Sequence, residues 1–86
     1  MIGVINKARN ITYSKKAQKY IARLGKIHKQ AIKGAIECLP SGDIKYFKSD
    51  DVYRLRVGDF RIIYYLVDDN GDIHIDKIGP RGDVYK

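Results

Sequence analysis

Cysteine, proline and long apolar runs are scarce in this 86-residue chain, and each scarcity excludes a class of protein. The single cysteine, Cys38, cannot form an intrachain disulfide, which excludes a small scaffold held together by disulfides. No apolar stretch approaches the roughly 20 residues that a membrane-spanning helix needs, and residues 1–7 are too short for the apolar part of a signal sequence. We therefore expect a cytoplasmic protein without a membrane partner.

The remaining composition is typical of one ordered domain, which we expect to cover residues 1–86. Hydrophobic residues make up 44% of the chain and charged residues 31%, which is unlike a disordered segment. A chain of this length buries only about 60% of the surface that its unfolded form exposes, so an active site should be shallow. His28 and His74 have no second ligand at metal spacing, and we expect neither a metal ion nor a cofactor.

Positive charge is concentrated in the first half of the chain. Residues 1–42 contain nine Lys and Arg against one acid, Glu37, whereas residues 43–86 contain eight Lys and Arg against nine Asp. A one-sided positive field attracts polyanions, because neutralised phosphates release their counterions. The distribution indicates a nucleic-acid partner, and charge alone leaves open the alternative of a lysine-rich, solvated helix face.

A helical hairpin is predicted in the first half of the chain. Ser14 is a suitable N-cap, and apolar side chains recur at helical spacing through residues 15–24. A second apolar set follows the same period through residues 31–39, until Pro-Ser-Gly at residues 40–42 ends it. Cys38 lies near the end of this second stretch, where we expect a small residue in the core or at its boundary.

The second half of the chain alternates apolar and polar residues, which is typical of strands. Strands are predicted at residues 52–57, 60–67 and 73–78, joined by turns at residues 58–59 and 69–72, and residues 9–13 form a further β-prone segment. The order predicts an α+β fold with an N-terminal strand, a helix hairpin and a three-stranded antiparallel meander. The helices should pack on one face of the sheet.

The alternation also predicts what lies on the other face. If the apolar positions of the first two meander strands pack against the helices, Arg54, Arg56 and Arg61 lie together on the opposite side. Three neighbouring guanidinium groups repel one another unless an anion bridges them. The cluster therefore favours a site for an anionic ligand.

Two segments carry a resemblance to a known family: residues 53–64, YRLRVGDFRIIY, and residues 78–85, IGPRGDVY. They closely resemble the signature of RelE toxins of the RelE/ParE superfamily, and the predicted element order agrees with that fold over about the whole chain. The resemblance implies the toxin of a type II toxin–antitoxin pair. Such a toxin enters the ribosomal A site, cleaves the messenger RNA there and inhibits translation.

The resemblance also implies roles for individual residues. Arg54, Arg61 and Arg81 match positions that contact and stabilise the scissile phosphate, and Tyr85 matches the C-terminal tyrosine that acts as general base. Metal-independent RNA cleavage uses the 2′-hydroxyl of the substrate as nucleophile, so fixed cations that stabilise the developing charge suit this chemistry. A tyrosine that only packs on the sheet is the alternative for Tyr85.

Further positive residues are candidates for substrate binding: Lys45, Lys48 and Arg56. Lys45 and Lys48 are expected just ahead of the sheet, where ordinary loop charges are the alternative. Some RelE proteins have lysine at the positions of Val52 and Arg54. A guanidinium does not readily surrender a proton, so we expect Arg54 to clamp the phosphate rather than to act as general acid.

The resemblance implies macromolecular partners. These are a cognate RelB-like antitoxin, a 70S-type ribosome with its 16S ribosomal RNA, messenger RNA, and promoter DNA only through the toxin–antitoxin complex. An acidic, partly disordered antitoxin segment could neutralise the arginine cluster. Two alternatives remain open: a ParE-like toxin that inhibits DNA gyrase without cutting RNA, and a family member that only binds RNA or antitoxin.

Overall fold

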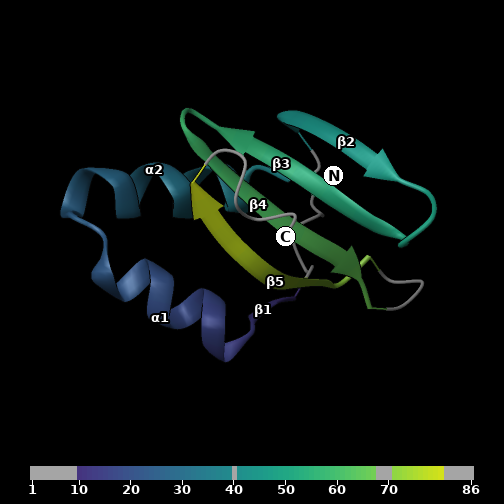
Figure 1. Ribbon diagram of the computed structural model, residues 1–86, viewed down its shortest axis with the longest axis horizontal. Coiled ribbons are helices and arrows are strands. Elements are labelled where there is room, and N and C mark those ends of the chain that lie inside the picture. The colour runs from purple at the N-terminus through teal and green to yellow at the C-terminus, as the bar shows by residue number, and fades with distance from the viewer. Residues whose placement is uncertain (1–9, 40, 68–70, 81–86) are drawn as a thin grey trace, which may run out of the picture.

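The computed structural model describes residues 10–39, 41–67 and 71–80, which form two helices and a five-stranded sheet (Figure 1). In chain order the elements are β1 (Ile11–Tyr13), α1 (Lys15–Arg23), α2 (Lys26–Glu37), β2 (Asp43–Phe47), β3 (Val52–Val57), β4 (Phe60–Leu66) and β5 (Ile73–Pro80). The strands lie in the order β1-β5-β4-β3-β2. Strands β2 to β5 pair antiparallel with their neighbours, and β1 pairs parallel with β5.

The α+β class and the helix hairpin are confirmed, but the predicted number of meander strands was wrong. The meander has four strands, because Asp43–Phe47 forms β2 at the edge of the sheet. Ile44 and Tyr46 alternate with charged residues in this segment, which is a strand pattern, but the segment is short and mostly exposed. A five-residue edge strand that is mostly exposed gives a weak sequence signal.

The helices begin and end at capping positions. The Ser14 hydroxyl accepts a hydrogen bond from the Ala17 amide at 3.0 Å and donates one to the Asp76 carbonyl at 2.6 Å. Ser14 therefore caps α1 and also ties its start to β5. Helix α1 ends one residue earlier than predicted, and α2 begins at Lys26, ahead of the apolar set at residues 31–39. Neither helix has the length and apolar character to cross a membrane, over the residues that the structure describes.

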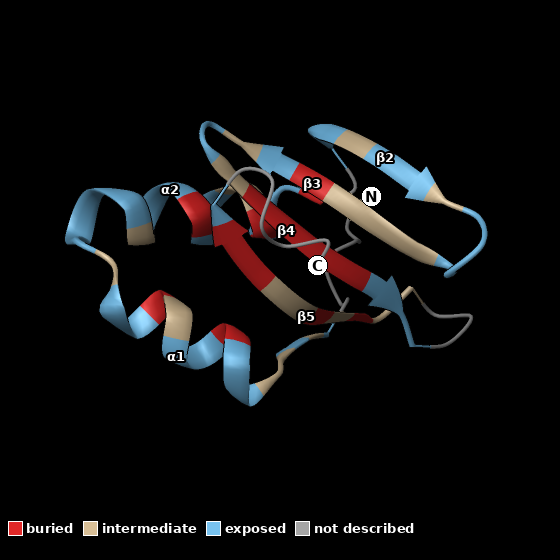
Figure 2. Ribbon diagram, in the orientation of Figure 1, coloured by how far each residue is buried: buried red, intermediate tan, exposed pale blue. Residues whose placement is uncertain are grey.

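The core lies between the helix pair and one face of the sheet (Figure 2). Its fully buried large side chains are Ile32, Ile36, Leu55, Ile62, Ile73 and Ile75. From α1, Ala17 and Ile21 are buried, as the helical spacing predicted. The prediction for Cys38 was wrong: α2 ends at Glu37, Leu39 turns into the core, and the thiol is exposed.

A β-bulge in β5 decides which residues face the core. Ile63 pairs with Lys77 and Tyr64 pairs with Ile75, so Asp76 is an extra residue without a partner in β4. The extra residue reverses the alternation of β5 at this point. As a result Ile73, Ile75 and Ile78 all join the core, while His74 and Lys77 are placed on the opposite face.

Candidate functional site

The face of the sheet opposite the helices carries the predicted arginines, and we call it the arginine face. Arg56 on β3 is the direct register partner of Arg61 on β4, and Arg54 pairs with Ile63 on the same side. Their neighbours Leu55 and Ile62 point into the core. The predicted grouping of Arg54, Arg56 and Arg61 on one face is confirmed.

The three arginines differ in their exposure to solvent. The side chain of Arg56 is half exposed, whereas 17% of the Arg54 side chain is exposed. Arg61 is buried, with 7% of the whole residue accessible. Arg61 Nη1 donates a hydrogen bond of 3.2 Å to the Phe60 carbonyl oxygen, and no carboxylate within the described residues forms an ion pair with it. A guanidinium that is largely removed from water acts more strongly on a nearby anion than a solvated one.

An acidic residue that the sequence did not single out lies among these arginines. Asp43 on β2 is the register partner of Arg56; its Oδ1 is 3.8 Å from Arg54 Nη2 and its Oδ2 is 3.9 Å from Arg56 Nε. Within the protein this carboxylate lies between Arg54 and Arg56 and forms no ion pair with Arg61. The sequence-based expectation of an anionic ligand stays a prediction. Arg54 Nε is buried and makes no hydrogen bond within the described residues.

The two candidate lysines lie in different places. Lys45 lies on β2 rather than in a loop, as the register partner of Arg54, and its ammonium is 5.3 Å from the centre of the Phe47 ring. Lys48 is exposed in the turn that joins β2 to β3, where its carbonyl accepts a hydrogen bond from the Asp51 amide. The structure therefore adds Lys45 to the arginine face and leaves Lys48 at its border.

Arg81 and Tyr85 lie outside the described residues. The structure describes β5 as far as Pro80, with Gly79 opposite Arg61 and Pro80 opposite Phe60. Lys77 is a further cation of the arginine face that the sequence analysis missed. It pairs with Ile63, in the row next to the pair of Arg61 and Gly79. Lys45, Arg54 and Lys77 thus lie in one row across the sheet, beside the row of Arg56 and Arg61.

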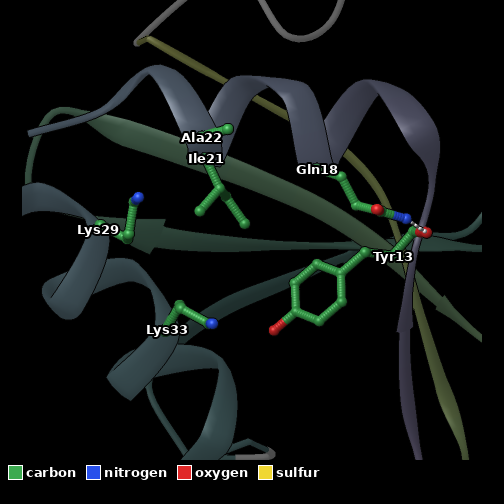
Figure 3. Close-up of a pocket in the computed structure, with 6 residues that line it drawn as sticks. All are labelled: Tyr13, Gln18, Ile21, Ala22, Lys29 and Lys33. Carbon is green, nitrogen blue, oxygen red and sulfur yellow. Dashed lines mark hydrogen bonds between the residues drawn. The ribbon is translucent and has the colours of Figure 1, made fainter.

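A pocket of about 270 Å³ lies elsewhere, between the helices and β1 (Figure 3). It is lined by Tyr13, Gln18, Ile21, Ala22, Lys29 and Lys33, none of which belongs to the arginine face. Burial raises the pKa of Tyr13, and the negative charge of Glu37 raises it further. The described residues contain no group of three or more His, Cys, Asp or Glu side chains that could hold a metal ion.

The arginine face is suited to bind a phosphodiester. Arginine forks pair with phosphate oxygens in two parallel hydrogen bonds, and two adjacent rows of cations can contact more than one phosphate. Charged groups that a sheet holds in place can stabilise a developing negative charge with little rearrangement, and this is the chemistry that such an arrangement allows.

Comparison with known proteins identifies the family of the chain. The family described as ParE toxin of type II toxin–antitoxin system, parDE, matches residues 11–85. A curated relative from Methanocaldococcus jannaschii, named Putative toxin RelE1, is 49% identical over 45 residues, which are 51% of this chain and 50% of that protein. The match therefore spans about half the length of this relative.

Solved structures show the same fold. The archaeal RelE–RelB complex from Pyrococcus horikoshii matches with 26% identity and a TM-score of 0.63, over 88% of this chain and 98% of that chain. The isolated Escherichia coli RelE toxin matches with 18% identity and a TM-score of 0.68, over 86% and 85% of the two chains.

The fold and the matches define the class, a toxin of a type II toxin–antitoxin system. The chain belongs to the ParE toxin family, and its fold is that of the RelE toxins. The resemblance found in the sequence is confirmed at this level.

Proposed function

We propose that this toxin is a metal-independent endoribonuclease that cleaves messenger RNA in the ribosomal A site and so inhibits translation. The 2′-hydroxyl of the substrate attacks the neighbouring phosphate, and no cofactor takes part. The observation that carries the proposal is the pairing of Arg56 with Arg61 beside Arg54. Asp43 forms ion pairs with Arg54 and Arg56, and no carboxylate of the described residues forms one with Arg61. A phosphodiester that replaces the Asp43 carboxylate meets a site with excess positive charge.

In this proposal the cations bind the phosphates, and a tyrosine transfers the proton. Arg54 and Arg61 clamp the scissile phosphate and stabilise the charge that develops on it. Arg56, Lys45 and Lys48 contact flanking phosphates, for which their greater exposure suits them. Arg81 adds a further cation in this proposal, and Tyr85 accepts the proton of the 2′-hydroxyl.

Substrate geometry comes in part from the ribosome. The arginine face is one side of a small sheet rather than a deep groove, so the protein alone has little surface with which to align an RNA strand for in-line attack. Cleavage of naked RNA should therefore be weak. The toxin works in the cytoplasm, where its ribosomal substrate lies.

A RelB-like antitoxin is the proposed resting partner. The structural relative from Pyrococcus horikoshii was solved as a RelE–RelB complex, and the cation rows of the arginine face offer a surface for an acidic segment. The resting state is then a heteromeric complex, which reaches promoter DNA through the antitoxin. Titration with the product of the neighbouring gene tests this part, and a product that neither binds nor blocks cleavage would contradict it.

The nuclease proposal is tested on ribosomes programmed with a defined message and holding an empty A site. Purified toxin is added, and message ends are mapped by primer extension beside a naked-RNA control. We expect cuts confined to the A-site codon. An intact message, with toxin shown to be folded by circular dichroism, would contradict the proposal.

The name of the matching family supports one second candidate, a ParE-like toxin that inhibits DNA gyrase and cuts nothing. A supercoiling assay with purified gyrase separates the two. The nuclease proposal predicts normal supercoiling at toxin concentrations that cleave ribosome-bound message.

A further inference from the structure

Tyr65 and His74 form an aromatic pair on the arginine face. They are register partners on β4 and β5, and the β-bulge at Asp76 places His74 on the same side as Tyr65. Their ring centroids are 5.2 Å apart at an angle of 45°. Without the bulge, strict alternation would direct His74 toward the core instead.

The imidazole of this pair is held from its other side. His74 is also the register partner of Thr12 on β1, and Thr12 Oγ1 lies 2.8 Å from His74 Nδ1. The hydrogen bond restricts the rotation of the ring, so the pair is a prearranged surface. A prearranged surface loses less conformational entropy when it binds a ligand.

Tyr65 is exposed in an unusual place. It lies on β4, the middle strand of the five, and yet 37% of its surface is accessible. Ile63, one step earlier on the same face, is 6% accessible although it is not part of the core cluster. A partly accessible aromatic ring beside buried positions offers its π surface to a ligand.

The aromatic pair continues the rows of cations. Arg61, Ile63 and Tyr65 follow one another on the same face of β4, at steps of about 6.8 Å. Lys77 lies opposite Ile63, between the row of Arg61 and the row of Tyr65. The face therefore carries two neighbouring rows of cations, and the aromatic pair forms the next row on β4 and β5.

We propose that Tyr65 and His74 form a stacking site for one nucleobase of a single-stranded RNA whose neighbouring phosphates lie on the arginines and Lys77. The inference rests on the proposed function for the choice of RNA as the ligand of the arginine face. Single-stranded RNA combines regularly spaced negative charges with flat bases, and proteins bind it with cations and aromatic side chains in the same combination. An acidic peptide would satisfy the cations but has no matching use for a tilted pair of rings.

The test measures binding rather than cleavage. The probe is a short single-stranded RNA with 2′-O-methyl groups throughout, which block attack by the 2′-hydroxyl, and its matched control has abasic sugars on the same backbone. Nuclear magnetic resonance titration follows the aromatic signals of the protein at low salt, where weak affinities remain measurable. We expect the probe with bases to bind between about fivefold and a hundredfold more tightly than the abasic probe.

Variants assign the preference to this site. Tyr65→Ala should remove most of the preference for bases and leave the affinity for the abasic probe unchanged, whereas Tyr65→Phe should keep the preference because the ring remains. Tyr46→Ala is the matched control: Tyr46 is 45% accessible but lies on the opposite side of the sheet, beside Tyr53. Its preference for bases should equal that of the unchanged protein.

Three results would overturn the inference. Equal affinity of the unchanged protein for the two probes would show that no base is bound, and this result is independent of whether ribosome-bound message is cut. Equal losses in Tyr65→Ala and Tyr46→Ala would show that the effect is not local. A Tyr65→Ala variant that binds RNA normally but loses its antitoxin would assign the pair to the protein partner.

Discussion

The carboxylate of Asp43 lies 3.8 Å from the guanidinium of Arg54 and reaches the neighbouring Arg56 with its other oxygen. This acid comes from the edge strand β2 and lies opposite Arg56 in the register. A phosphate that uses the same guanidinium groups must compete with Asp43. We therefore expect Asp43 to weaken the binding of an anion to the arginine face.

Replacing Asp43 by asparagine should strengthen RNA binding. Asp43 carries a negative charge about 4 Å from the guanidinium groups that would bind a phosphate. In a water-like environment two charges at this distance interact by about 1 kcal/mol, so its removal should raise the affinity for RNA by about fivefold. The measurement is a titration with a non-cleavable RNA oligonucleotide at several salt concentrations. Asp50→Asn, in the exposed turn before β3, is the control for the change in net charge. Equal gains in both variants would contradict a local role for Asp43.

Replacing Arg61 should reduce cleavage far more than ribosome binding. Loss of one prearranged donor to a transition state typically lowers the rate by about 10²- to 10³-fold, which we expect for Arg61→Ala. Arg61→Lys keeps the charge but loses the fork, so its rate should be intermediate. Single-turnover cleavage on programmed ribosomes measures the rates, and circular dichroism checks the fold, because Arg61 is largely buried.

Arg23→Ala provides the matched control for this series, since Arg23 is exposed in the last turn of α1. Its cleavage rate should remain close to that of the unchanged protein. Equal cleavage rates for folded Arg61→Ala and Arg23→Ala would show that Arg61 takes no part in the reaction.

Truncation in the core should destabilise the fold strongly. Ile36 is fully buried between α2 and the sheet, and Ile36→Ala should lower the free energy of unfolding by about 2–5 kcal/mol. Ile27→Ala, at a site that is 80% exposed, should change it by less than about 0.5 kcal/mol. Urea denaturation followed by circular dichroism measures both values. A small effect at Ile36 would show that α2 is not anchored as described.

The stability of the fold should decrease at high pH. The pKa of Tyr46 is raised, first by the 2.7 Å hydrogen bond from its hydroxyl to Asp51, and the pKa of Tyr13 is raised mainly by burial. When the folded pKa exceeds the unfolded one, the folded state binds more protons above about pH 10, and stability falls as the pH rises further. Ultraviolet titration of the phenols should show Tyr46 ionising earlier in Asp51→Asn, and an unchanged titration would contradict the hydrogen bond.

The sequence predicts those parts of the fold in which apolar residues repeat regularly. The spacing of Ala17 and Ile21 defines the buried side of α1, and Gly58, with a φ of +56°, forms the turn between β3 and β4 where it was expected. Alternation in β3 and β4 was sufficient to place the three arginines on one face. These features depend on residues that are close together in the chain.

The features that the sequence did not predict depend on contacts between distant segments. Strand β2 is short and mostly exposed, and only its pairing with β3 brings Asp43 to the arginines. The bulge at Asp76 arises in the pairing of β4 with β5, so the position of His74 did not follow from alternation. Likewise, alternation gives the side on which Arg61 lies but not its burial.

The most direct test of the central claim compares two messages on programmed ribosomes. They are identical except that the nucleotide on the 5′ side of the cleavage site carries ribose in one and 2′-deoxyribose in the other. If the arginine face promotes attack by the 2′-hydroxyl, the ribose message is cut in the A-site codon and leaves a 2′,3′-cyclic phosphate end, and the deoxyribose message stays intact. Equal cutting of the two messages, or no cutting of either by folded toxin, would contradict the account.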